Sequence, residues 1–289
     1  MEHENSYPSY RFIEMISMRH NALKTETLVT NQGRVSYYHY ETDGVYHTIL
    51  FIHGLGGDKK WFPGHLEKYS LDRYTWIVPD LIGHGESERI EELESYSMQS
   101  QAKALYEILK HQQVKHVAIL AHSMGGPIAL SLIEQIIADD TIRPTHLFYL
   151  EGNIDSGDAF FSSKVASMPL KEYMSKFDAW YEQAIKETED GLLLDWYKGI
   201  GNAGPVSVWA SSTDLVRVSK SGEVIDRLKK VLTFPSYFFF GEKNKGLYSS
   251  EKLLIQKEFQ IIYVPSAGHS MYLENPEWFW GTIHDLLSD

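Results

Sequence analysis

Short apolar runs alternate with longer helical patterns along most of this chain, and that alternation limits the folds available to it. Compact runs such as TILFIH (48–53) and HVAILA (116–121) are typical of strands buried on both faces of a parallel sheet. The segments between the later runs carry apolar residues about 3.6 positions apart, as amphipathic helices do. The alternation therefore predicts an α/β fold with a mostly parallel, doubly wound sheet.

The pattern predicts eight strands. Two of them, TETLVT (25–30) and RVSYYHY (34–40), flank the turn-forming NQG and predict an antiparallel hairpin at one edge of the sheet. The other strands are expected at residues 48–53, 74–79, 116–121, 145–151, 236–240 and 260–265. Helices are expected at 97–112, 125–138, 250–258 and 276–287.

Residues 153–234 contain no strand-like run and interrupt the alternation. We expect an all-helical cap here, inserted into a core of residues 1–152 and 235–289 and covering the carboxyl edge of the sheet, where ligands of such sheets bind. Its aromatic residues should mostly form the cap's own core, with a few facing the cleft. They are Phe160, Phe161, Phe177, Trp180, Tyr181, Trp196, Tyr197 and Trp209.

Within this insertion, GIGNAG (199–204) matches the glycine spacing of dinucleotide-binding loops. The match predicts no nucleotide site, because such a loop must follow a strand and open a helix, and this one is followed at once by Pro205.

Composition excludes several classes of protein. The net charge of −12 argues against unaided binding to nucleic acid or to an anionic membrane surface. The chain has no cysteine, which excludes disulfides and thiolate metal sites. Its first residues show no secretory signal, and no apolar run approaches the roughly 20 residues of a membrane span. We expect a soluble, cytoplasmic protein with a small-molecule substrate, and the sequence predicts no oligomeric state.

The stretch VAILAHSMGGPIAL (117–130) carries the main chemical signal. A strand ends, Ser123 follows, and a helix starts at once, with the small residues Ala121 and Gly125 on either side. A serine on so tight a strand-to-helix turn is strained, tolerates only small neighbours and lies at a helix N-terminus. A serine before a helix can also be a simple N-cap. The pattern favours a nucleophile.

Two further stretches support this interpretation. FIHGLGG (51–57) leads from a strand into a flexible loop, where the amide of Leu55, together with that of Met124, would form an oxyanion hole. VPSAGHSMYLENPEWF (264–279) follows the last strand, and Gly268 leaves room for His269. His269 is the candidate base.

These motifs together resemble the α/β-hydrolases. HGLGG, DLIGHGES (80–87), AHSMGG (121–126) and GHSMYLENP (268–276) follow in the family's order, with Ala121 where the family pattern has glycine. The resemblance covers nearly the whole chain. It implies Ser123 as nucleophile, His269 as base, Leu55 and Met124 as oxyanion donors, a structural Asp80, and no metal or organic cofactor.

The position of the catalytic acid departs from the family pattern. The usual place follows the seventh strand, and there this chain has Asn244. Glu151 ends the sixth strand, one strand away, and can reach the same imidazole. Left unpaired in the core it would cost several kcal/mol. Glu151 is the preferred acid, and Asp155, Asp158 and Glu242 remain alternatives.

The sequence therefore predicts a serine hydrolase of the carboxylesterase class that cleaves an ester or lactone with a partly apolar acyl group. Some α/β-hydrolases carry an aspartate nucleophile at the strand-to-helix turn and form an aspartyl ester. Ser123 at this turn excludes that mechanism. The same residues would also serve a carbon–carbon bond hydrolase or an amidase. A non-catalytic ligand receptor on a hydrolase scaffold is the rival from another class, and Asn244 is the feature in its favour.

Overall fold

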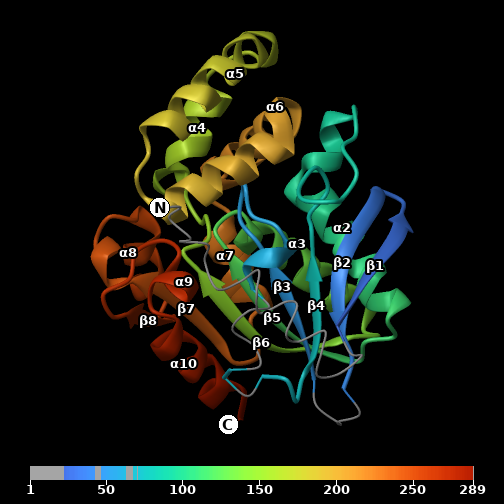
Figure 1. Cartoon of the computed structure of the whole chain (residues 1–289). Helices are drawn as coiled ribbons and strands as arrows, with labels where there is room; N and C mark the ends of the chain where they lie inside the picture. Colours follow the sequence, from blue (N-terminus) through green and yellow to red (C-terminus); the bar gives the residue numbers. More distant parts are fainter. Residues whose placement is uncertain (1–22, 43–46, 63–67, 70, 289) are drawn as a thin grey trace, which may run out of the picture.

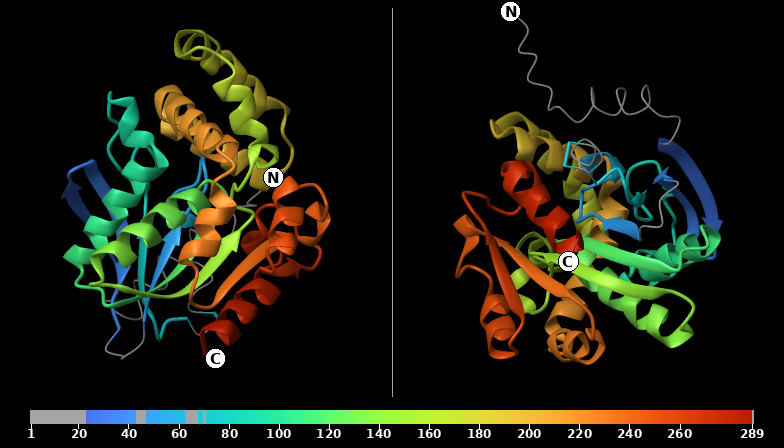
Figure 2. Two further views of the ribbon diagram at one scale, coloured as in Figure 1. Left: turned by 180° about the vertical axis from the view of Figure 1, so that it is seen from behind. Right: turned by 90° about the horizontal axis from the view of Figure 1, so that it is seen from below.

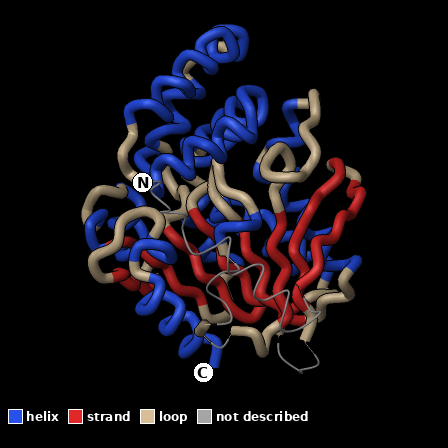
Figure 3. Tube along the Cα trace, in the orientation of Figure 1, coloured by secondary structure: helices blue, strands red, loops and turns tan. Residues whose placement is uncertain are grey.

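A computed structural model describes residues 23–42, 47–62, 68–69 and 71–288. The first residues, for which the sequence analysis predicts no secretory signal, lie outside these ranges. Figure 3 shows the strands as one central sheet with helices around it. The eight strands are β1 Leu23–Thr30, β2 Gly33–Tyr40, β3 Thr48–Ile52, β4 Thr75–Pro79, β5 His116–His122, β6 Arg143–Leu150, β7 Ser236–Gly241 and β8 Gln260–Val264.

The strand order is β1-β2-β4-β3-β5-β6-β7-β8. The β1–β2 and β2–β4 pairs are antiparallel, and every pair from β4 to β8 is parallel. The predicted mostly parallel eight-stranded sheet and its edge hairpin are confirmed. The bounds differ from the prediction by one or two residues, because strand ends are set by pairing with neighbours rather than by the apolar run itself.

Helices cover both faces of the sheet (Figures 1 and 2). One buried cluster joins alternate strand residues such as Leu50 and Ile52 to α2, α3, α7 and α8, and the other joins Ile49 and Phe51 to α9 and α10. This is the period-two alternation of a strand with two apolar faces. These helices are α2 Met98–His111, α3 Gly125–Asp139, α7 Val224–Val231, α8 Ser249–Gln256, α9 Met271–Glu274 and α10 Pro276–Ser288.

The insertion forms α4 Phe160–Ala166, α5 Leu170–Glu187, α6 Gly191–Lys220 and α7. Figure 1 shows α4, α5 and α6 beyond one end of the sheet. The long helix α6 is kinked at Gly204, which has φ 80° and ψ 165° and precedes Pro205. In contrast, α7 lies against α3, where Arg227 pairs with Glu134 at 2.7 Å.

None of the helices formed by the described residues combines the length and the apolar character that crossing a bilayer requires.

Candidate active site

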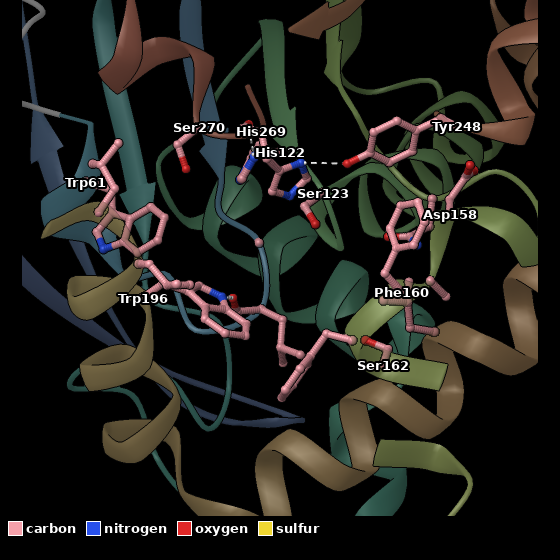
Figure 4. A pocket seen from close by; sticks show the side chains of 18 of the residues that line it. Trp61, His122, Ser123, Asp158, Phe160, Ser162, Trp196, Tyr248, His269 and Ser270 are labelled. Carbon is pink, nitrogen blue, oxygen red and sulfur yellow. Dashed lines mark hydrogen bonds between the residues drawn. The ribbon is translucent and has the colours of Figure 1, made fainter. Parts of the chain in front are cut away.

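Four adjacent strands end at the same edge of the sheet and bring the candidate residues together. Ser123 directly follows β5, Glu151 follows β6, Asn244 lies in the turn after β7, and His269 lies in the loop after β8. Since β5, β6, β7 and β8 are neighbours in the sheet, residues separated by more than a hundred positions meet there. Figure 4 shows Ser123 and His269 side by side in the wall of a cavity.

Ser123 lies on a strained turn. Its φ of 54° falls in the left-handed region, which costs a non-glycine residue of order 1 kcal/mol or more. Its amide donates to the carbonyl of Leu150 at 2.9 Å, which holds the turn against β6. A Cβ on Gly125 would lie 2.6 Å from the Ile52 carbonyl oxygen, so only glycine fits there. This contact explains the glycine two residues after the serine.

Glu151 and His269 form a short hydrogen bond: His269 Nδ1 lies 2.7 Å from Glu151 Oε2. The glutamate side chain is 0% exposed and the histidine side chain 43% exposed, so the carboxylate is shielded from solvent while the imidazole faces the cavity. Glu151 has a φ of 39°, also in the left-handed region. Its amide donates to the Phe239 carbonyl at 2.9 Å, which secures this second strained turn to β7.

The buried carboxylate of Glu151 has further donors besides His269. The Gly241 amide donates to Oε1 at 2.7 Å, and Asn244 Nδ2 lies 3.0 Å from each carboxylate oxygen. A buried charge is tolerated only when it is paired and hydrogen-bonded, and these contacts meet that condition. Asn244, at the position where the family has an acid, therefore supports the Glu151 carboxylate from the neighbouring strand.

The alternative acids are bonded elsewhere. Asp155 caps a short helix by accepting from the Gly157 amide at 2.9 Å. Asp158 accepts from the Ile154 amide at 2.8 Å and from the Ser250 hydroxyl at 2.9 Å, and burial raises its pKa. Glu242 accepts from the Ser266 amide at 2.9 Å. Among the described carboxylates, only that of Glu151 is hydrogen-bonded to His269.

Sequence reasoning missed two neighbours of His269. The Tyr248 hydroxyl lies 3.0 Å from Nδ1, beside Glu151, and burial raises the pKa of this tyrosine (Figure 4). His122 Nε2 lies 3.0 Å from the His269 carbonyl oxygen, and burial holds the pKa of His122 well below its ordinary value. A neutral His122 donates this hydrogen bond and fixes the backbone of His269. His122 lies within the AHSMGG motif and Tyr248 within no motif, but neither contact could be predicted, because each joins residues far apart in the sequence.

The loop after β3 lies beside the serine. The amide of Gly57 donates to the carbonyl of Gly54 at 3.0 Å and closes a tight turn that contains Leu55. A Cβ on Gly54 would lie 2.9 Å from Ser123 Cβ, so the turn approaches the serine closely. Met124 is the N-cap residue of α3, next to the serine. Among the described residues, the amides of Leu55 and Met124 have no hydrogen-bond partner, which leaves both free for a ligand oxygen.

Buried polar residues brace this loop from below. His53 Nδ1 lies 2.7 Å from the Gly54 carbonyl, and His53 Nε2 accepts from the Leu81 amide at 3.0 Å. Asp80 binds Lys59 Nζ at 2.6 Å and accepts from the Glu86 amide at 2.8 Å. Asp80 therefore shapes its loop, as expected from the sequence.

A cavity of about 440 Å³ opens above the serine. Three of the aromatic residues of the insertion considered from the sequence line it, Phe160, Phe161 and Trp196, whereas Trp209 Nε1 donates to the Met168 carbonyl at 2.8 Å within the insertion. The wall of the cavity formed by the insertion is mostly apolar, and the wall near the sheet is polar. The polar residues along it are His122, Ser123, Asn153, Asp158, Ser162, Asp190, Tyr248, His269, Ser270 and Glu274.

Across the described part of the chain, no three His, Asp or Glu side chains are arranged to hold a metal ion.

Comparison with known proteins identifies the family. A sequence model of the alpha/beta hydrolase fold matches residues 47–143. The uncharacterized hydrolase YugF of Bacillus subtilis (strain 168) is 36% identical over 263 residues, which span 88% of this chain and 94% of that protein. The chain belongs to the alpha/beta hydrolase superfamily. The family resemblance seen in the sequence motifs is thereby confirmed.

Two more proteins are similar to this chain over most of their length. The 2-succinyl-6-hydroxy-2,4-cyclohexadiene-1-carboxylate synthase of Enterobacter sp. (strain 638) is 25% identical over 247 residues, 79% of this chain and 86% of the synthase. The structure of the esterase EaEST from Exiguobacterium antarcticum superposes with a TM-score of 0.71 at 16% identity, covering 92% of this chain and 100% of the esterase. At that identity the structural likeness concerns the fold.

Proposed function

We propose that this member of the superfamily is a serine hydrolase that cleaves an uncharged carboxylic ester or lactone. The observation that carries the proposal is the 2.7 Å hydrogen bond between Glu151 and His269, made beside a strained Ser123 in the wall of one cavity. A nucleophile, a base and a group that orients the base are the three parts such a reaction needs.

In the proposed reaction, Ser123 Oγ attacks the carbonyl carbon while its proton passes to His269 Nε2. Glu151 holds the Nδ1 proton of the imidazole and stabilises the imidazolium that forms. The amides of Leu55 and Met124 donate to the carbonyl oxygen as it becomes negative, at the N-terminus of α3. His269 then returns the proton to the departing alcohol oxygen, which leaves an acyl group on Ser123.

The second half of the reaction repeats the first with water as nucleophile. His269 takes a proton from water, the hydroxide attacks the acyl carbon, and Ser123 Oγ leaves with that proton as the acid product is released. Residues of this chain supply every group in the cycle. Asn244 supports the reaction indirectly, since its amide donates to Glu151 rather than to the imidazole.

The lining of the cavity supports an uncharged substrate with a partly apolar acyl group. Leucine and aromatic side chains of α4 and α6 lie opposite the serine, and we propose that α4, α5 and the first half of α6 act as a cap over it. None of the described lining residues is Lys or Arg, while Asp158, Asp190 and Glu274 are acidic. An anionic substrate would lose hydration there without gaining a cation.

A second candidate is carbon–carbon bond cleavage or a related reaction with the same residues. The similarity to the Enterobacter synthase, which is named for a carboxylate, favours a reaction other than ester hydrolysis but does not specify the bond that breaks. The lack of a cation among the described lining residues argues against a carboxylate substrate and ranks this candidate second. Amide cleavage and a receptor role remain alternatives that the same experiments address, and localisation in the cytoplasm stays a prediction from the sequence.

The decisive test uses a fluorophosphonate probe on the purified protein. Wild type should be labelled at neutral pH and Ser123→Ala should not, with both folded by thermal melt. Wild type should also hydrolyse neutral p-nitrophenyl butyrate at least about tenfold faster, in kcat/KM, than an ester of similar length that ends in a carboxylate. An unlabelled but folded wild type would favour the receptor, and faster cleavage of the anionic ester would overturn the proposed substrate class.

A further inference from the structure

The cap helix α6 touches the backbone of the loop that carries Leu55. Trp196 Nε1 donates to the Leu55 carbonyl oxygen at 2.7 Å, across 141 residues of sequence. This is a short bond for an indole N–H, whose usual distance to oxygen is about 2.9 Å. Trp196 and Leu55 also line the same cavity, so the bond lies at the edge of the site.

A second contact lies one helical turn further along α6. A Cβ placed on Gly199 would lie 1.7 Å from the Gly56 carbonyl oxygen and 2.8 Å from its carbon, so the helix rests directly on the loop backbone. From the other side, a Cβ on Gly56 would lie 2.9 Å from the Ile200 side chain. The first glycine of the GIGNAG stretch thus serves close packing of backbone against backbone.

The loop needs such support. Gly54, Gly56 and Gly57 surround Leu55, and Gly56 has a φ of 75°, a conformation that glycine adopts without cost but also leaves easily. An oxyanion donor works only when its N–H already points to where the negative oxygen will form, at about 2.7–3.1 Å. A glycine-rich loop free to rotate would lose part of that preorganisation.

We propose that Trp196 and Gly199 are positioning residues that hold the Leu55 amide in place, so that the cap completes the oxyanion hole. This inference rests on the proposed function, in which Leu55 is an oxyanion donor. Trp196 binds the carbonyl of the Leu55–Gly56 peptide unit, and Gly199 packs against the carbonyl of the Gly56–Gly57 peptide unit. Trp196 also packs against Phe161, with ring centroids 4.9 Å apart, and both residues line the cavity. A substrate that contacts these rings would therefore also contact the residue that holds the loop.

The chain offers a matched control. Trp209 belongs to the same helix and makes the same kind of bond, from Nε1 to the Met168 carbonyl at 2.8 Å, but away from the cavity. Trp196→Phe and Trp209→Phe each remove one indole N–H and keep an aromatic ring. Gly199→Ala removes no hydrogen bond. Its added methyl group would collide with the Gly56 carbonyl oxygen and displace the loop from α6.

Each variant should be measured for kcat and KM on p-nitrophenyl butyrate and for inhibition by two ketones. Ser123 Oγ adds to the carbonyl carbon of a trifluoromethyl ketone, and the carbonyl oxygen becomes an oxyanion. The matching methyl ketone binds without this addition and reports ground-state binding. Trp196→Phe and Gly199→Ala should lower kcat by about tenfold to a hundredfold and weaken the trifluoromethyl ketone by a similar factor. KM and methyl ketone binding should change less than about threefold, and Trp209→Phe should match wild type.

The inference would be overturned if Trp196→Phe behaves like Trp209→Phe, or if it raises KM and weakens both ketones alike, which would make the indole a simple wall of the cavity. If a thermal melt shows that Trp196→Phe does not fold, Gly199→Ala decides by the same criteria, and a Gly199→Ala with unchanged kcat rejects the inference. A wild type that neither cleaves esters nor binds the trifluoromethyl ketone would instead reject the proposed function.

Discussion

Asn244 donates its side-chain N–H to both carboxylate oxygens of Glu151, with each distance 3.0 Å. The amide stands where the family pattern has an acid, and the Glu151 carboxylate stands at the end of the neighbouring strand. Because β6 and β7 are paired, the two positions exchange roles without moving the imidazole. The departure seen in the sequence is therefore compatible with catalysis.

Glu151→Gln should lower kcat by up to about 10⁴-fold, because an amide cannot hold His269 in the required tautomer. The substitution keeps the shape of the side chain and offers an N–H where an acceptor is needed. The measurement is ester turnover at neutral pH, with folding followed by thermal melt.

Asn244→Ala is the control for that variant and should cost far less, since Glu151 keeps the Gly241 amide as a donor. A crippled Asn244→Ala beside a nearly normal Glu151→Gln would show that the acid has been assigned to the wrong residue.

The acid should also be transferable. The double variant Asn244→Asp, Glu151→Gln places a carboxylate at the family's usual position. The amide that replaces the Glu151 carboxylate, directly after β6, would then lie beside it. We expect the double variant to recover at least about tenfold of the turnover lost in Glu151→Gln alone. No recovery in a folded double variant would mean that the loop after β7 cannot present a carboxylate to His269.

Asn244→Asp alone should make stability depend on pH in a defined direction. Two carboxylates about 3 Å apart cannot both ionise, so the pair acquires a raised pKa in the folded protein. The folded state then binds more protons than the unfolded state above about pH 4, and stability falls as pH rises through the raised pKa. The melting temperature relative to wild type should drop more at pH 8 than at pH 5, and an equal drop at both would contradict this.

Buried neutral histidines should destabilise the wild type in mild acid. Burial lowers the pKa of His53 and His122 and brings that of His84 to about 3. The unfolded chain protonates these groups below about pH 6.5 while the folded chain does not, so stability is lost as pH falls from there. Each contributes up to about 1.4 kcal/mol per pH unit in that range.

Urea unfolding between pH 7.5 and 5.5 measures this loss. Burial raises the pKa of Asp58 and Asp158, and these carboxyl groups act in the opposite direction, so the comparison with a histidine variant isolates the histidine contribution. His84→Gln should give a shallower decline than wild type. Stability that stays flat or increases towards pH 5.5 would argue against neutral buried histidines.

Phe161→Ala should shift acyl preference towards longer chains. Phe161 lines the cavity and packs against Trp196 and Trp180, so its removal adds room on the cap side. The ratio of kcat/KM for p-nitrophenyl decanoate over butyrate should rise by about tenfold, as a few newly buried methylenes allow. Met174→Ala, at an exposed position of α5, should leave the ratio unchanged. An unchanged ratio in Phe161→Ala would mean that the acyl group lies elsewhere.

Local sequence patterns were enough to predict the elements that depend on neighbouring residues. Apolar runs and helical periodicity located all eight strands, and the NQG turn located the edge hairpin. The tight strand-to-helix turn at Ser123 was also predictable, because its small neighbours and the adjacent helix lie within a few residues of it. In such segments the chemistry of neighbouring residues limits the backbone directly.

Tertiary structure alone decided which side chains meet. Four carboxylates in loops after β6 and β7 were candidates from the sequence, with Glu151 preferred, and only the pairing of strands in the folded chain brings Glu151 to His269 across 118 residues. The same holds for Tyr248 beside the base and Trp196 on the Leu55 carbonyl. These contacts depend on strand order, turn geometry and the placement of α6, which arise from packing of the whole chain and leave no periodic trace in it.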